Sequence, residues 1–187
     1  MDIKITRTKV IILLVSLFVT SSALADQNDP RLDTLFKSLQ SDDSIVSGED
    51  IADRIWDIWI ETPDPSLESK MKNGVLAMSR HNFDTALKSF DTIIETAPDY
   101  AEGWNKRATV YFMMGQYNSS MSDVHRTLGL EPRHFGALSG MGLIFMATGN
   151  DQRALQAFQE AIKVNPHMPT VHEYINYLKE KIERNTI

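Results

Sequence analysis

The sequence contains no cysteine among its 187 residues. A disulfide framework is therefore excluded, and so is a lipid anchor attached through a cysteine near the N-terminus. Runs of basic residues are also missing, and the net charge is −6 at pH 7. A surface that binds nucleic acid needs clustered Lys and Arg to neutralise phosphates, so we expect no nucleic-acid partner.

Residue patterns typical of catalysis are missing as well. No two histidines stand at i and i+4 with an acidic partner, as a zinc protease helix requires. There is no glycine-rich phosphate loop, and the stretch 136–140, which superficially resembles a nucleophile motif, falls inside a predicted helix. We therefore expect neither enzymatic activity nor a cofactor.

Only one long apolar run is present, in residues 10–19, and it follows Lys4, Arg7 and Lys9. Small residues before Asp26 complete the pattern of a signal peptide, which predicts export to the bacterial periplasm and cleavage after Ala25. An uncleaved membrane anchor is the alternative, but a spanning helix needs about 20 apolar residues and this run is shorter. Cleavage removes three basic residues and one acidic residue, so the net charge changes from −6 to −8, and no stable membrane insertion is expected afterwards.

A constant repeat period dominates the rest of the chain, and it equals the step from Gly74 to Ala108 and from Ala108 to Gly142. Between the repeated positions, apolar residues recur with helical spacing, so each unit is predicted to form two amphipathic helices ended by a proline. A constant period of this length is typical of helix–turn–helix arrays, in which each unit buries its apolar face against its neighbours. The columns that carry the period are Gly74, Ala108 and Gly142; Ala86 and Ala154; Phe90 and Phe158; and Pro98, Pro132 and Pro166.

From Ser66 to about Pro166, these units resemble the tetratricopeptide repeat. The third unit matches that pattern best, whereas the second departs from it at Ser120, Val124 and Thr127. The resemblance implies an all-α, right-handed superhelical array that binds other proteins and has no catalytic role. The expected organisation is a signal peptide at 1–25, a helical segment at 26–65, repeats at 66–99, 100–133 and 134–167, and a capping helix at 168–187.

The segment 26–65 has two interpretations. A helix is predicted at 48–60, since its apolar residues share one face and Ser47 can cap its N-terminus. Ala52 and Trp56 keep the register of two repeat columns, which favours a degenerate repeat that seals the N-terminal end of the array. The glycine and proline columns fail, which favours an independent helix pair.

In tetratricopeptide arrays, the first helix of each repeat lines a concave groove, and the resemblance gives that role here to a mainly apolar set of residues. An apolar surface rich in methionine suits an extended peptide or an amphipathic helix of a partner protein. The N-terminal segment, with Trp56 and Trp59, could instead pack across this groove and occlude it. The predicted groove residues are Met71, Val75, Met78, Asn105, Thr109, Phe112, Met113, Ser139, Leu143 and Met146.

Some members of the family hold a C-terminal carboxylate with Asn, Lys and Arg. Here Asn105 stands one place early, and Gly136 and Gly140 occupy the Lys and Arg positions, so we do not expect that mode. The alternative function is a periplasmic metal- or ligand-binding protein that uses Met and His, since thioethers select Cu(I). The methionines are spread over many helical turns, which disfavours such a site.

Overall fold

The structure is a computed structural model that describes residues 26–41 and 46–185. The predicted signal peptide lies outside these residues. Within them, the chain forms α-helices and one short 3-10 turn and no strand, which confirms the predicted all-α fold. The elements are α1 (Arg31–Leu39), α2 (Gly48–Ile60), the turn η1 (Pro65–Leu67), α3 (Glu68–Ser79), α4 (Phe83–Thr96), α5 (Ala101–Met113), α6 (Tyr117–Leu130), α7 (Phe135–Ala147), α8 (Asp151–Val164) and α9 (Pro169–Arg184).

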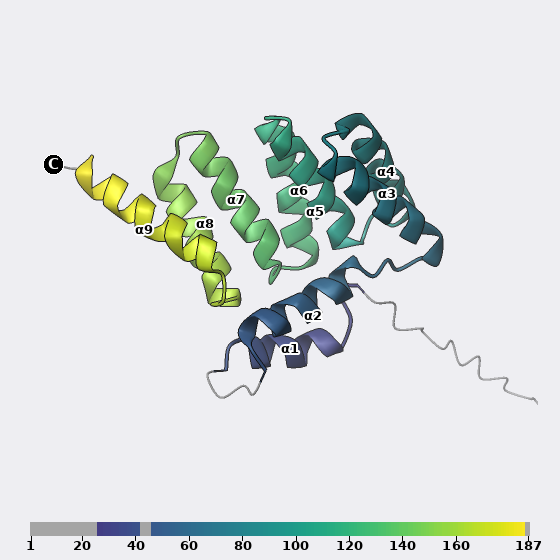
Figure 1. Cartoon of the computed structure of the whole chain (residues 1–187), viewed down its shortest axis with the longest axis horizontal. Coiled ribbons are helices and arrows are strands. Elements are labelled where there is room, and N and C mark those ends of the chain that lie inside the picture. The colour runs from purple at the N-terminus through teal and green to yellow at the C-terminus, as the bar shows by residue number, and fades with distance from the viewer. Residues whose placement is uncertain (1–25, 42–45, 186–187) are drawn as a thin grey trace, which may run out of the picture.

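Helices α3 to α8 form three hairpins that stack side by side, α3 with α4, α5 with α6 and α7 with α8 (Figure 1). In the first and third hairpins, a glycine lets the two helices cross closely. A Cβ atom at Gly74 would lie 2.6 Å from the ring of Phe90, and one at Gly142 would lie 2.5 Å from the ring of Phe158. The repeated glycine is therefore explained by packing against the phenylalanine column.

The second hairpin solves the same crossing with a different pair of residues. Ala108 packs in one cluster with Val124, which stands where the other hairpins have phenylalanine. Ser120 adds a hydrogen bond across the crossing, since its Oγ donates to the carbonyl oxygen of Ala108 at 2.8 Å. The two departures of this repeat from the pattern are thus coupled, because Val124 is smaller than phenylalanine and makes room for the methyl group of Ala108.

The turn inside each hairpin uses one residue with positive φ. Gly115 has a φ of 71° and Gly149 a φ of 74°, and His81 takes the equivalent place in the first hairpin with a φ of 58°. Glycine adopts this conformation without steric cost, whereas it is uncommon for other residues.

An arginine on α5 ties the first two hairpins together. The guanidinium of Arg107 donates to Asp123 on α6 in a bidentate pair, at 2.7 and 2.9 Å, and to Asp91 on α4 at 2.7 Å. Such a fork-shaped pair fixes geometry as well as charge.

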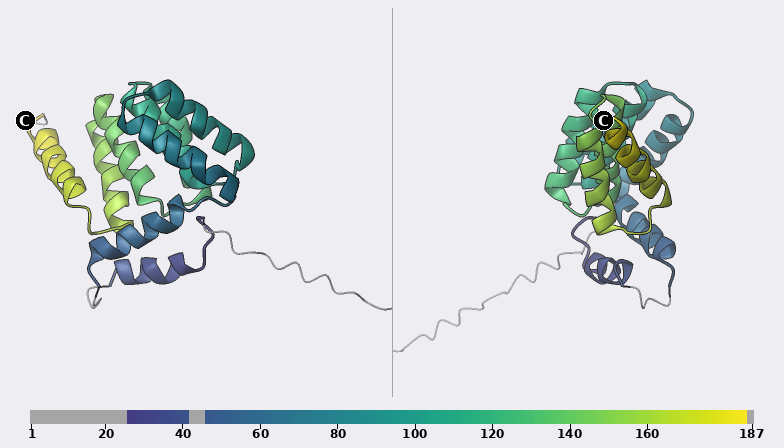
Figure 2. Two further views of the ribbon diagram at one scale, coloured as in Figure 1. Left: turned by 45° about the vertical axis from the view of Figure 1, so that its right-hand side comes forward. Right: turned by 90° about the vertical axis from the view of Figure 1, so that its left-hand side faces the viewer.

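The helix pair α1–α2 crosses one edge of the array and does not stack along α3 (Figures 1 and 2). It meets the N-cap residues of α5, α7 and α9, which are Tyr100, His134 and Met168 and recur at the repeat period. We call these three residues the N-cap column. Tyr100 Oη donates to the carbonyl oxygen of Trp59 at 2.7 Å, the ring of His134 stacks on Trp59 with centroids 4.1 Å apart, and Met168 packs against the core of the pair.

Each loop that follows a hairpin also makes a polar contact with the N-terminal segment. The side-chain amide of Gln27 donates to the carbonyl oxygen of Asp99 at 2.6 Å, Arg133 pairs with Asp33 at 2.7 Å, and the His167 ring lies 3.2 Å from the carbonyl oxygen of Leu39. The N-terminal pair is thus held along the full edge of the array.

The helix predicted at 48–60 is confirmed as α2. Ser47 caps it as expected, because its Oγ accepts a hydrogen bond from the Asp50 amide at 3.1 Å. That residues 26–65 are a degenerate repeat stays a prediction. At the other end of the chain, α9 buries Val171, Ile175 and Leu178 against α8.

Candidate functional site

A pocket of about 270 Å³ opens between α5 and α7. Phe112 of α5, Val124 of α6 and Leu143 of α7 supply its apolar lining, and Ser139 and Gly140 of α7 also line it. The small residues create the space: a Cβ atom at Gly140 would meet only Val124, at 4.0 Å. The pocket therefore has the size and lining to take one apolar side chain of a ligand.

Trp56 of α2 lines the end of this pocket that is next to Gly136. It lies against Gly136, where a Cβ atom would come within 2.5 Å of its ring, and it makes edge-to-face contacts with His134 and Phe135, both with centroids 5.4 Å apart. Within this pocket, the N-terminal segment thus contributes one side chain, and the rest of the pocket stays open.

A second hollow of about 510 Å³ continues from α7 towards α9. It shares Trp56, Ser139, Leu143 and Met168 with the first pocket and adds Tyr174 from α9. The two hollows therefore meet at α7, which carries Ser139 and Leu143, and at Trp56 and Met168 beside it. Together we call them the groove.

Behind the groove lies a buried polar cluster centred on Glu102, which is 1% exposed. Its Oε2 accepts hydrogen bonds from Asn105 at 2.9 Å and from His134 at 3.0 Å, and Lys106 Nζ lies 2.8 Å from its Oε1. The Nδ1 atom of His134 accepts the amide hydrogen of Ala137, so the ring proton must lie on Nε2. His134 thus caps α7 through one nitrogen and donates to Glu102 through the other.

Two opposing effects act on the pKa of Glu102. Burial raises it, but the charge of Lys106 and the hydrogen bond from His134 lower it by more, so the pKa lies below its ordinary value of 4.5. The carboxylate is thus charged near neutral pH, and Lys106 balances it. Lys106 also lies over the ring of Trp56, with Nζ 5.3 Å from the centroid, so α2 covers this cluster.

The structure brings half of the predicted groove residues together. Asn105, Thr109, Phe112, Ser139 and Leu143 all line the pocket between α5 and α7. Asn105 is buried, and its side-chain amide is bonded to Glu102, so it supports the pocket wall from behind.

The other predicted groove residues lie elsewhere. Met71 is buried in the core of the first hairpin, and Met78 packs at the margin of the same core. Val75 and Met113 are exposed, while Met146 packs beside α8 and α9. A binding role for any of the ten residues stays a prediction.

Sequence reasoning missed Lys106 and Met168 as residues of the groove, and it missed the buried Glu102. One signal was available: Tyr100, His134 and Met168 follow the same repeat period as the columns that were recognised. Their side chains have no chemistry in common, so the column is visible only once its helix-capping position is known.

The structure also bears on membrane insertion and metal binding. In residues 26–41 and 46–185, no helix combines the length and the apolar character that crossing a membrane requires. In the same residues, no three His, Asp or Glu side chains come together as metal ligands would.

The fold defines a class of protein, an array of helical hairpins with a groove along the first helices. Within that class, the model of the tetratricopeptide repeat matches residues 135–168. A TPR repeat-containing protein of Rhizobium etli is 39% identical over 155 residues, which cover 83% of this chain and 76% of the relative. The chain belongs to the tetratricopeptide repeat family.

Solved structures agree in fold. The Sgt2 TPR domain from Aspergillus fumigatus aligns with a TM-score of 0.62 at 21% identity, over 66% of this chain and 83% of that domain. The first TPR domain of Spaghetti (RPAP3), bound to the HSP90 peptide SRMEEVD, aligns with a TM-score of 0.60 at 14% identity, over 63% of this chain and 93% of that one. At these identities the likeness shows the helical repeat fold.

Proposed function

We propose that the chain is a non-catalytic scaffold of the bacterial cell envelope that binds an apolar peptide or helix of another protein in the groove. The observation that carries the proposal is the pocket between α5 and α7, which is lined by Phe112 and Leu143 and left open by Gly140. An apolar anchor side chain buried there would account for most of the affinity, as anchors do in other peptide grooves.

The charges near the groove favour an apolar ligand over an acidic chain end. Lys106 is paired with Glu102, and Arg107 is paired with Asp91 and Asp123. Neither cation is free to hold a carboxylate without abandoning a partner. The RPAP3 domain was solved with a peptide that ends in an acidic residue, so we expect this chain to use the same groove for different chemistry.

The proposed location rests on the N-terminal segment. Its basic start, apolar run and small residues before Asp26 are those of a signal peptide, which implies export to the periplasm and cleavage after Ala25. Cleavage there would keep Gln27, whose side chain also accepts a hydrogen bond from the Ala101 amide at 3.1 Å. N-terminal sequencing of the protein recovered from cells checks this point.

The groove is tested by filling it. In Gly140→Leu, the new side chain has room to enter the pocket, and loss of a helical glycine favours folding by up to about 1 kcal/mol. The matched control is Gly129→Leu on α6, where a Cβ atom would meet nothing within 4 Å and the same helical glycine is removed. Both proteins should therefore fold at least as well as wild type.

The measurement is affinity capture from cell envelopes, quantified by mass spectrometry, with all three proteins at equal loading. We expect Gly140→Leu to lose a partner about tenfold or more, as loss of one anchor does, while Gly129→Leu retains it. If Gly140→Leu captures the same proteins as the control in the same amounts, the groove is not the binding site.

A further inference from the structure

The first hairpin has an exposed end face, and the equivalent positions in the later units show what usually covers such a face. Leu76, Val110, Ile144 and Leu178 stand one repeat period apart, each in the first helix of its unit. Val110 is 0% exposed, Ile144 3% and Leu178 0%, but Leu76 is 48% exposed. The same position is thus buried in three units and open to solvent in the first.

The buried side chains of this column share one kind of packing. Val110 packs in the core of the first hairpin with Phe90 and Ile93, and Ile144 packs with Ala108 and Val124 of the second. Each side chain at this position therefore inserts into the hairpin that precedes it. Among the described residues, no hairpin precedes Leu76 in this way, because α1–α2 docks along the N-cap column at another edge (Figure 2).

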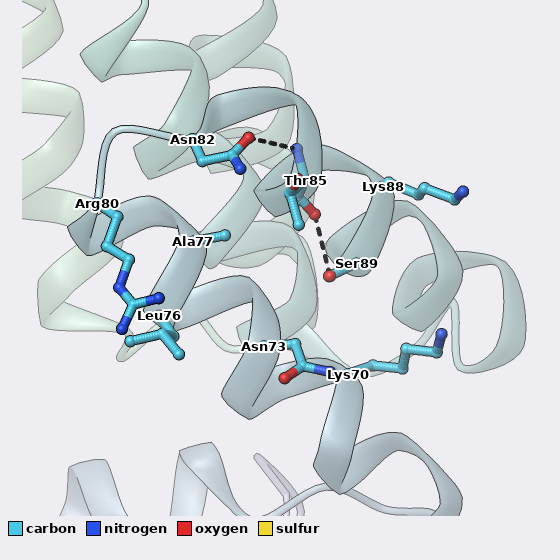
Figure 3. A pocket seen from close by; sticks show the side chains of 9 residues that line it. All are labelled: Lys70, Asn73, Leu76, Ala77, Arg80, Asn82, Thr85, Lys88 and Ser89. Carbon is cyan, nitrogen blue, oxygen red and sulfur yellow. Dashed lines mark hydrogen bonds between the residues drawn. The ribbon is translucent and has the colours of Figure 1, made fainter.

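A hollow of about 560 Å³ lies beside Leu76, between α3 and α4. Figure 3 shows Leu76 and Arg80 on one side of it and the side chains of Lys70 and Lys88 on the other, with Asn73 between them. The same surface of a later unit would be covered by helices.

The hollow is positively charged. Lys70, Arg80 and Lys88 line it, no carboxylate does, and none of the three takes part in the ion pairs that the described residues form. Their concentration stands out in a chain whose net charge is −6. At the next junction, Arg107, which is the repeat equivalent of Asn73, pairs at 2.7 Å with Asp91 of the preceding hairpin.

We propose that this end face, formed by α3 and α4, binds an acidic amphipathic helix of another protein, which takes the place of a preceding hairpin. The apolar face of that helix covers Leu76, and its carboxylates meet Lys70, Arg80 and Lys88. The site is separate from the groove, so the scaffold can hold two partners at once.

A second copy of this chain is a poorer occupant on charge. Two end faces placed together would oppose three cations with three cations. The exposed side of α9, at the other end of the array, carries His172, Lys179 and Arg184 among its acidic residues, so it offers no uniformly negative surface.

The test uses two synthetic helical peptides with the same apolar face, one flanked by Glu and the other by Lys. Their binding to the chain from Asp26 onward is measured by fluorescence anisotropy at two salt concentrations. We expect the Glu peptide to bind about tenfold or more tightly than the Lys peptide, with the difference reduced at high salt because exposed charges are screened.

Variants at exposed positions make the test specific. Leu76→Glu should weaken the Glu peptide about tenfold or more, and Lys70→Glu combined with Lys88→Glu should reverse the preference between the peptides. Lys179→Glu on α9 and Gly140→Leu in the groove should change neither the affinity for the Glu peptide nor the preference between the two peptides.

Three results would overturn the proposal. Equal or absent binding of the two peptides removes its basis in charge. Unchanged binding by Leu76→Glu places the peptide elsewhere. A dimer of wild type in analytical ultracentrifugation that Leu76→Glu dissociates assigns the face to a second copy of this chain.

Discussion

At the scale of single residues, the buried ion pair of Glu102 predicts how stability depends on pH. Glu102→Ala leaves Lys106 and the Nε2–H of His134 without their acceptor, and removal of one partner of a buried pair costs about 3–5 kcal/mol. We therefore expect a loss of about 3 kcal/mol in the free energy of unfolding near neutral pH, measured by urea denaturation.

The pH dependence has a definite sign. Since the pKa of folded Glu102 is below 4.5, its contribution is fully present above that value and is lost as the pH falls through the lower folded pKa. The difference between wild type and Glu102→Ala should thus shrink as the pH is lowered to about 3. Glu160→Ala, which removes an exposed partner of Lys163, is the control and should have little effect at either pH. A constant difference for Glu102→Ala would contradict a charged carboxylate.

At the scale of helices, the crossing of α7 and α8 predicts a coupled pair of substitutions. In Gly142→Ala, the new methyl group meets the ring of Phe158, which is fully buried and stacks on Tyr174, so it cannot move aside cheaply. Overpacking of this kind costs about 1–3 kcal/mol, which outweighs the roughly 1 kcal/mol that alanine gains in helix propensity. In a Phe158→Val background, the same change should be neutral or stabilising.

Urea unfolding of the four proteins in this cycle gives the coupling energy directly. We expect at least about 1 kcal/mol between the two positions, because they are in contact. Gly129→Ala controls for helix propensity alone, since nothing lies within 4 Å of a Cβ atom there, and should stabilise the protein. Strict additivity of Gly142→Ala and Phe158→Val would show that the crossing does not require the glycine.

The same helices show how far sequence reasoning reaches. The hairpins and the helix at 48–60 could be predicted because their signals are local: helical spacing, the proline that ends each unit and the Ser47 cap. The placement of α2 could not, since it depends on contacts between Trp59 and the N-cap column, whose members are distant from it in sequence.

The candidate groove was predictable in part for a related reason. Phe112, Ser139 and Leu143 follow from the register of the repeat, and the structure places them in one pocket. Met71 has the same register but is buried in its own hairpin, beside a hollow that also includes Ile60 and Pro65. The segment that leads into α3 covers it, and the repeat pattern contains no information about that segment.

At the scale of the whole molecule, the array has two surfaces of different chemistry. The groove is mainly apolar and its nearby cations are paired, whereas the end face at Leu76 is ringed by cations that form no ion pair with the described residues. The N-terminal pair α1–α2 lies along a third edge and adds Trp56 to the groove. Under the proposed function, the groove would be the principal binding site and the end face a second one.

Site-specific cross-linking in growing cells tests that role of the groove most directly. A photoreactive residue replaces Thr109, which is exposed at the rim of the pocket, and in a parallel strain it replaces Tyr177, which is exposed on α9. The account predicts that position 109 cross-links to an apolar segment of another protein, that Gly140→Leu abolishes this product, and that position 177 does not form it. Identical products from both positions, or a product at 109 that Gly140→Leu leaves unchanged, would contradict binding in the groove.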